Sequence, residues 1–523
     1  MFSLNYLTYS FMSSTATRII KNSGFLYLRI AVVTFLSLYT TRLILDVLGA
    51  SDFGIYSIVG GVIAMLGFLN GAMASATQRF MSYSEGENDK EKQKRIFNIS
   101  LCIHFAISLL LVVLLVIAGV ICFLYVLNIP AERLFAAKVV YACLVLSTAF
   151  SVSSVPYEAV LNAHENMLYY SIVGILDAAL RLAVAISLYY VAFDKLMAYG
   201  VMMAIIPLIT LTIMRWYCHT HYEECKISLI KYYNKAQAKE MVTFAGWNFL
   251  SKAGNVIVMQ GSSVVLNAFG GVLVNAAHGI ANQLAGYLLV FSSNMQKALS
   301  PVIVKKEGEH NRQQMLAFSL AGNKFSYLLF AFFAIPVCIE MPYILQLWLK
   351  EPPEYAVLFC RLIVVRRLIG QLTSTFATSI GATGDIKQNS IMNAVIMGLA
   401  LPVACLCYIM GAPIYIMYVV LIVMVILMGV CDTYYMWKQC DLRLNLFFKS
   451  VILPCLLITI LTFMVGMPFH WEMPVGFLRL ACVLVACFLA CIVLGYAIGM
   501  TAREKDVIKG LVANIITKVC KKH

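Results

Sequence analysis

Charged residues are scarce in this chain. Of its 523 residues only 12% are Asp, Glu, Lys or Arg, whereas 61% are hydrophobic. A water-soluble globule cannot bury that much apolar surface, which excludes a large soluble catalytic domain and makes lipid the expected solvent. Acidic residues are scarcer than basic ones, with 25 Asp and Glu against 39 Lys and Arg.

Three further features are lacking, and each excludes a class of protein or segment. The 16 cysteines are scattered and show no metal-site spacing, so neither a metal nor another cofactor is expected. The basic residues form no concentrated module, which argues against nucleic-acid binding. No small-residue cleavage site follows the first apolar stretch, so we expect a retained signal anchor.

What the chain does have is a long series of apolar stretches, each near the roughly 20 residues that a helix needs to cross a bilayer. The sequence predicts an all-α polytopic membrane protein with about fourteen such helices. They cover residues 24–45, 53–77, 97–126, 137–161, 168–191, 197–217, 241–267, 273–299, 319–346, 355–380, 389–410, 414–436, 449–468 and 476–499.

Lys and Arg gather in alternate loops, which the positive-inside rule assigns to the cytoplasm. An even number of spans with both termini in the cytoplasm satisfies this pattern. The predicted organisation is a cytoplasmic N-terminal segment (1–23), a six-helix lobe (24–217), a cytoplasmic linker (218–240), a second six-helix lobe (241–436), two further helices (437–499) and an amphipathic cytoplasmic tail (500–523).

The two predicted lobes share weak sequence similarity at an offset of about 220 residues. Because six helices is an even number, both lobes keep one orientation, and a parallel repeat is expected. In the outer turn after the first helix of each lobe, Gly49 and Gly270 are expected to permit a sharp change of direction. The matching segments are LDVLGASDFGIY (45–56) with LNAFGGVLVNAA (266–277), EGEND (85–89) with EGEHN (307–311), and NAHENM (162–167) with GATGDI (381–386).

Charged side chains at membrane depth are costly and usually face a cavity or each other, so they are the best candidates for a site. Most of those in this chain are cations, which favours an anionic substrate held by guanidinium contacts to phosphate. The candidate substrate-binding cations are Arg29, Lys252, Arg181, Arg366 and Arg367. Asp177 is a possible coupling carboxylate or charge partner of Arg181, four residues away, and Asp432 is a second acidic residue near the end of its span.

Several polar residues of the predicted spans are candidates for contacts to sugar hydroxyls, with interhelical hydrogen bonds as the open alternative. The candidates are Asn70, Asn248, Gln260 and Asn282.

Residues 27–82, GWNFL (246–250) and VNAAHGIANQ (274–283) resemble the O-antigen and polysaccharide flippases of the multidrug/oligosaccharidyl-lipid/polysaccharide (MOP) exporter superfamily. The resemblance implies a V-shaped, MATE/MurJ-like bundle in the bacterial inner membrane. It further implies a transporter that carries an undecaprenyl-diphosphate-linked oligosaccharide outward by alternating access, for surface polysaccharide biosynthesis. Membrane lipids, a polysaccharide polymerase and other assembly proteins are the implied partners.

Two other functions compete with that expectation. A Na⁺- or H⁺-coupled multidrug exporter of the same superfamily is the closer alternative, with Asp177 as its one plausible coupling carboxylate. A membrane enzyme is the other. Asp46 and Asp52 flank an outer turn and His104 is intramembrane, but the outer loops are short and turn or packing roles explain these residues. We therefore expect no enzyme and no catalytic residue.

Overall fold

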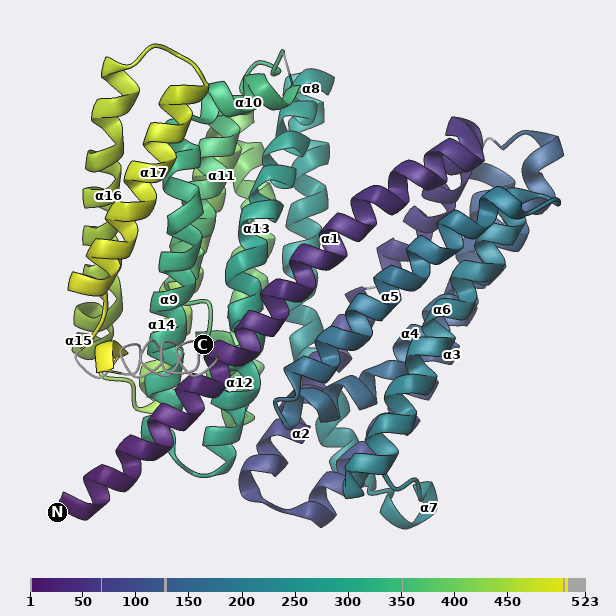
Figure 1. Ribbon diagram of the computed structural model, residues 1–523, viewed down its shortest axis with the longest axis horizontal. Helices are drawn as coiled ribbons and strands as arrows, with labels where there is room; N and C mark the ends of the chain where they lie inside the picture. The colour runs from purple at the N-terminus through teal and green to yellow at the C-terminus, as the bar shows by residue number, and fades with distance from the viewer. Residues whose placement is uncertain (1, 67, 127–128, 350, 502–503, 507–523) are drawn as a thin grey trace, which may run out of the picture. The chain divides into compact units, whose positions relative to one another are not determined.

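A computed structural model describes residues 2–66, 68–126, 129–349, 351–501 and 504–506, and helices joined by short turns make up these ranges (Figure 1). The α-helices are α1 (Phe2–Leu66), α2 (Phe68–Glu87), α3 (Lys90–Ile121), α4 (Leu134–Ala163), α5 (Met167–Ser187), α6 (Lys195–His221), α7 (Leu229–Tyr232), α8 (Lys235–Gly308), α9 (Arg312–Ile339), α10 (Met341–Leu349), α11 (Ala356–Gln371), α12 (Phe376–Thr383), α13 (Lys387–Ile409), α14 (Ile416–Cys440), α15 (Leu444–Phe447), α16 (Leu453–Glu472) and α17 (Phe477–Leu494). The predicted all-α class is confirmed.

Ten helices in the described ranges are long and apolar enough to cross a membrane. The other four predicted spans are divided differently among the helices. Residues 53–66 belong to α1 and residues 68–77 to α2, and both 241–267 and 273–299 lie within α8. Residues 355–380 are split between α11 and α12. The predicted tail helix falls largely outside the described residues.

The chain divides into two compact units, which we describe separately. Unit 2 comprises residues 22–249 and 304–310, and unit 1 comprises residues 1–21, 250–303 and 311–523. In unit 2, α4 packs on α2, α3 and α6. In unit 1, α14 packs on α11, α12 and α13, and α9 packs on α11, α16 and α17.

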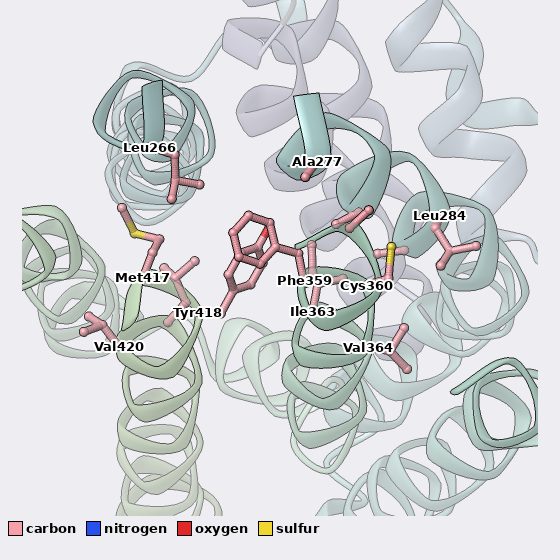
Figure 2. Packing of buried hydrophobic residues seen from close by; sticks show 14 of the residues in the cluster. Leu266, Ala277, Leu284, Phe359, Cys360, Ile363, Val364, Met417, Tyr418 and Val420 are labelled. Carbon is pink, nitrogen blue, oxygen red and sulfur yellow. The ribbon is translucent and has the colours of Figure 1, made fainter. Parts of the chain in front are cut away.

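The core of unit 1 is apolar and close-packed around two aromatic rings. The ring centroids of Phe359 on α11 and Tyr418 on α14 lie 4.6 Å apart, and both side chains are inaccessible to solvent (Figure 2). By contrast, only 22% of the apolar window of α3 is buried, against 61% of that of α9. Most of the apolar window of α3 is therefore exposed, as expected for a helix that contacts lipid.

The repeat that the sequence indicates is present in the backbone of both units. Gly49 turns α1 with a φ of 75° and Gly271 turns α8 with a φ of 78°. These left-handed conformations favour glycine because it has no Cβ. The prediction of Gly270 as the second turn residue was wrong by one position, because the sequence holds two adjacent glycines. With Gly271 the two turns share the 222-residue offset of the EGEND and EGEHN segments.

The same offset recurs where the second long helical segment of each repeat begins. Asp89 accepts a hydrogen bond from the backbone N–H of Lys92 at 2.9 Å, and Asn311 accepts one from that of Gln314 at 3.1 Å. Such a cap satisfies a backbone donor that the helix itself leaves unpaired. The residues before these caps, Asn88 and His310, both have positive φ values, of 57° and 55°.

One predicted helix is broken in the second repeat. The counterpart of the continuous α4 is α11 followed by α12, with turn residues 372–375 between them. Asn323 of α9 stabilises this break. Its Oδ1 accepts a hydrogen bond from the backbone N–H of Thr375 at 2.8 Å and another from the Thr375 hydroxyl at 2.9 Å. Discontinuous helices of this kind are typical of binding sites in transporters.

A buried charge cluster secures the last two long helices to the rest of unit 1. Glu340, which follows α9, has no exposed surface. It accepts hydrogen bonds from Arg479 of α17 at 2.8 Å and from His470 of α16 at 2.7 Å. Paired in this way the three groups are compatible with burial, whereas an isolated carboxylate is not.

Candidate functional site

Candidate binding residues occur in both units, and each group is built on a different helix. In unit 2 they follow one face of α5, where residues three or four apart lie above one another. The face includes Tyr170, Gly174, Asp177 and Arg181. In unit 1 they lie on α11 and on the neighbouring part of α8.

Arg29 of α1 lies against the first part of the α5 face. Its guanidinium carbon is 4.6 Å from the ring centre of Tyr170, a cation–π contact. A Cβ at Gly174 would collide with the Nε of Arg29, so glycine provides the room that the guanidinium occupies. Within the described residues Arg29 has no acidic partner. Its charge therefore remains available to a ligand.

Further along α5, Arg181 is paired as the sequence predicts. Its Nε donates to Asp177 at 2.7 Å and its Nη2 donates to the other carboxylate oxygen at 3.4 Å. The side chains are 39% and 31% exposed, so the pair is open to an incoming ligand. Arg181 also interacts electrostatically with Tyr56 and Tyr199, two tyrosines that the sequence gave no reason to select.

In unit 1 the adjacent Arg366 and Arg367 are cations without a compensating charge among the described residues. Both are half-buried on α11, and the Nε of each is inaccessible to solvent and makes no hydrogen bond. No ion pair to either side chain occurs in the described parts of the chain. Two adjacent unpaired guanidinium groups repel each other and favour a bound anion.

A polar group of α8 and α14 lies beside this pair. Arg366 interacts electrostatically with His278 and Tyr418. The Nδ1 of His278 is 2.7 Å from the Tyr418 hydroxyl, and its Nε2 is 2.9 Å from the amide nitrogen of Asn282. The sequence-predicted Asn282 is thus linked to the Arg366 environment through His278.

The other candidates are more dispersed. Lys252 and Gln260 are exposed on the part of α8 in unit 1, and Asn248 is half-buried on the part in unit 2. The side chain of Asn70 lies outside the described residues. Asp52 is buried and forms an ion pair with Arg133, while His104 is packed and bonded to the Ser100 carbonyl at 2.8 Å.

The sequence analysis did not predict a charged cluster in unit 2 that includes His164, because its members are far apart in sequence. His164, in the turn after α4, donates to Glu224 and lies 3.4 Å from Glu85. Burial alone would lower the pKa of His164, but the two carboxylates raise it to about 9. Burial opposes ionisation of Glu85 as well, yet His164, Lys305 and Gln93 lower its pKa.

The EGEND and EGEHN segments contact each other beside this cluster. A Cβ at Gly86 would collide with the Lys305 carbonyl oxygen, and a Cβ at Gly308 would collide with that of Tyr83. The contact is therefore reciprocal between equivalent glycines of the repeat. Lys305 adds a 3.5 Å ion pair to Glu85. We call this contact the glycine crossing.

Comparison with solved structures identifies the class of fold. The chain has the fold of the MATE transporters of the MOP superfamily. It is similar to a multidrug resistance MATE transporter in an outward-facing conformation, at 14% identity and a TM-score of 0.67. It is also similar to a MATE protein in the bent conformation, at 12% identity and a TM-score of 0.71.

A third similar structure is a MOP superfamily transporter from Pyrococcus furiosus, whose description states that reverse polarity of its binding pocket suggests a different function. Its identity is 12% and its TM-score 0.67. In all three cases the match covers 82% of this chain and 96% of the other. No model of a known protein family and no curated protein sequence matches the chain.

Proposed function

We propose that this protein is a flippase that moves an undecaprenyl-diphosphate-linked oligosaccharide from the cytoplasmic to the periplasmic leaflet of a bacterial inner membrane by alternating access. The observation that carries the proposal is the pair Arg366 and Arg367, which has no compensating charge in the described parts of the chain and whose two buried Nε atoms lack a hydrogen-bond partner there. A buried cation without a partner is costly, and an anionic cargo would supply the missing charge.

A diphosphate suits these groups chemically. Guanidinium forms two parallel hydrogen bonds with phosphate oxygens, and such charge-assisted bonds are about twice as strong as neutral ones. In unit 2, Arg29 offers a second cation without an acidic partner among the described residues. Arg181 is neutralised by Asp177, so we assign it a secondary contribution. Lys252, exposed on α8, is proposed to attract the anion before it reaches Arg366 and Arg367.

The oligosaccharide needs polar groups rather than charge. Asn282 and His278 lie beside Arg366, where an amide and an imidazole can bond sugar hydroxyls. Asn248, Gln260 and Asn70 remain proposed contacts. Delivery of a lipid-linked sugar to the periplasm implies a polysaccharide polymerase and other assembly proteins as partners. Both termini are proposed to lie in the cytoplasm, as the positive-inside rule predicts.

The test uses the full chain in liposomes that contain a polyprenyl-diphosphate oligosaccharide with a fluorescent label on its sugar. A membrane-impermeant quencher reports how fast the label crosses. We expect Arg366→Gln and Arg367→Gln each to slow crossing by roughly tenfold or more, which corresponds to about 1.4 kcal/mol. Substitution by Lys should restore part of the rate, because Lys keeps the charge but lacks the bidentate geometry.

Arg361→Gln is the matched control. Arg361 lies on the same helix but is exposed and donates to the Cys338 carbonyl at 3.1 Å. The substitution should leave the crossing rate unchanged. Equal rates for wild type, Arg366→Gln and Arg367→Gln at equal protein density would reject the flippase proposal.

Multidrug export is the second candidate, because one of the similar structures is described as a multidrug resistance transporter. Asp177 is the carboxylate that such a protein would use for coupling to Na⁺ or H⁺. The same liposomes distinguish the two functions. Uptake of a cationic dye that depends on Asp177 and is unaffected by Arg366→Gln would support drug export, whereas a flippase leaves dye uptake at the level of empty liposomes.

A further inference from the structure

An exposed basic surface lies in unit 2, on the segment that joins α6 to α8. Between Cys225 and Glu240 this segment has four lysines and no acidic residue. All four lysines are exposed, and none forms an ion pair with the described residues. Glu91, a carboxylate that Lys231 influences, is already paired with Lys94 at 2.8 Å. A partner outside the chain can therefore reach the charge of Lys226, Lys231, Lys235 and Lys239.

Exposed apolar side chains are interspersed with these lysines. Ile230 is 98% exposed and Tyr233 is 54% exposed, while Ile227 and Leu229 are 45% and 43% exposed. Transfer of such side chains from water into apolar surroundings is favourable. A mixture of basic and large apolar residues is typical of segments that lie in a membrane interface. We call the four lysines and these four apolar residues the linker surface.

Contacts with α3 hold the linker surface in place. Asn98 of α3 is only 1% exposed. Its Nδ2 donates to the Lys226 carbonyl at 3.0 Å, and its Oδ1 accepts from the backbone N–H of Ser228 at 2.8 Å. The short helix α7 follows these bonds and packs on α3 (Figure 1). The segment is thus bound to α3 through its backbone, which leaves the side chains of the linker surface exposed.

The same contacts fix the depth of the linker surface relative to the membrane. Phe97, which precedes Asn98, lies against His219 of α6, with ring centroids 6.4 Å apart. Trp216 lies three residues before His219, about 4.5 Å along the helix axis, and is 68% exposed. Tryptophan is enriched at the level of lipid headgroups. Because α6 is long and apolar enough to span the membrane, Trp216 marks the interface at its end, and the linker surface lies close to that level.

We propose that the linker surface binds anionic phospholipids of the membrane that the protein spans. The lysine ammonium groups pair with the phosphates of the headgroups, and Ile230 and its apolar neighbours enter the boundary between headgroups and acyl chains. Clusters of about four to eight basic residues beside a membrane-spanning helix are typical of binding to anionic lipids. A zwitterionic lipid offers the lysines no net charge, so the contact should depend on the headgroup.

A free phosphate ion or a soluble protein fits this surface less well than a lipid does. Free phosphate could pair with the lysines but would leave Ile230 in water. A soluble protein would have to reach a surface at the depth of the headgroups, beside the exposed Trp216. An anionic lipid covers both parts, because its headgroup and acyl chains belong to one molecule. The contact involves no cargo and does not rest on the proposed flippase function.

Hydrogen–deuterium exchange of the full-length protein in lipid nanodiscs tests the proposal without cargo. Nanodiscs of phosphatidylglycerol supply an anionic headgroup, and nanodiscs of phosphatidylcholine with the same acyl chains supply a zwitterionic one. We expect the backbone amides of residues 226–239 to exchange at least about threefold more slowly in phosphatidylglycerol. The difference should shrink in about 0.5 M NaCl, because salt screens exposed charges. Soluble glycerol phosphate added to phosphatidylcholine nanodiscs should not reproduce the protection.

Two matched double variants complete the test. Lys231→Gln with Lys235→Gln should remove most of the difference between the two lipids. Lys138→Gln with Lys195→Gln removes the same charge from other exposed lysines of unit 2 and should keep the wild-type difference. Equal exchange of the wild type in the two lipids, as a surface for a soluble protein would show, would overturn the proposal. So would an equal loss of the difference in both double variants, or full protection by soluble glycerol phosphate.

Discussion

Arginine residues in the two units differ in what compensates their charge. Arg181 has a bidentate carboxylate partner in Asp177, and Arg29 rests on the face of Tyr170. Arg366 and Arg367 have neither among the described residues. An anionic cargo would therefore gain most at Arg366 and Arg367, less at Arg29, and least at Arg181, where it must compete with a carboxylate.

The first prediction concerns the space that Arg29 occupies. Gly174→Ala places a methyl group where the Nε of Arg29 lies. Because an arginine side chain is flexible, we expect it to move away from Tyr170 without unfolding the protein. Loss of this cation–π position should slow cargo crossing about 3- to 30-fold while the Tm stays within a few degrees.

Gly246→Ala is the control for this substitution. Gly246 also lies in unit 2, and a Cβ there meets no atom within 4 Å. Its crossing rate should equal that of the wild type. If both alanine variants slow crossing equally, the position of the Arg29 side chain does not determine the crossing rate.

The second prediction is a pH dependence that arises from His164. Its pKa rises from 6.5 to about 9 in the folded state, so the protonated cluster stabilises the fold fully below about pH 6.5 and loses this contribution as the pH rises through 9. The loss is at most about 3 kcal/mol, since one pKa unit corresponds to about 1.4 kcal/mol. The Tm of the wild type should fall between pH 6.5 and 9.5.

His164→Gln removes the titrating group from that cluster. Its Tm should be lower than that of the wild type at pH 6.5 and should change less up to pH 9.5. Glu85 and Glu224 have lowered pKa values and stay ionised throughout this range, so they do not obscure the comparison. Parallel curves for wild type and variant would show that His164 is not the titrating group.

At the scale of elements, the repeat was predictable where glycine and capping residues mark turns. The EGEND and EGEHN segments, and the Gly49 turn, could be found from sequence because these conformations restrict the residue type. The break between α11 and α12 could not be predicted from the sequence. It depends on hydrogen bonds from residues 374 and 375 to Asn323 of α9, a partner about 50 positions away.

The glycine crossing gives the third prediction. At Gly308 a Cβ would meet the Tyr83 carbonyl, which is backbone and cannot rotate away as a side chain can. We expect Gly308→Ala to destabilise the protein by about 1–3 kcal/mol. Gly279→Ala, on the same helix with open space around it, should instead be neutral or stabilising by up to about 1 kcal/mol.

Thermal or denaturant unfolding of the two alanine variants measures this difference. A Gly308→Ala protein as stable as Gly279→Ala would show that the segments do not cross this closely. Since Gly86 is the counterpart of Gly308, Gly86→Ala should behave like Gly308→Ala.

At the scale of the whole molecule, composition and hydropathy were sufficient to predict an all-helical membrane protein. They could not predict which polar side chains share a site. Arg366 and Asn282 are far apart in sequence and are linked through His278, whereas the candidate cation Lys252 is exposed on α8. Which residues meet depends on packing, which hydropathy does not encode.

The charge of the cargo is the central claim, and a binding comparison tests it most directly. Native mass spectrometry of the full chain with equal amounts of undecaprenyl diphosphate and the uncharged alcohol undecaprenol measures the preference between them. The wild type should bind the diphosphate at least about tenfold more tightly, and the double variant Arg366→Gln, Arg367→Gln should lose most of that preference. Equal binding of the two lipids by the wild type, or an unchanged preference in the double variant, would contradict the claim.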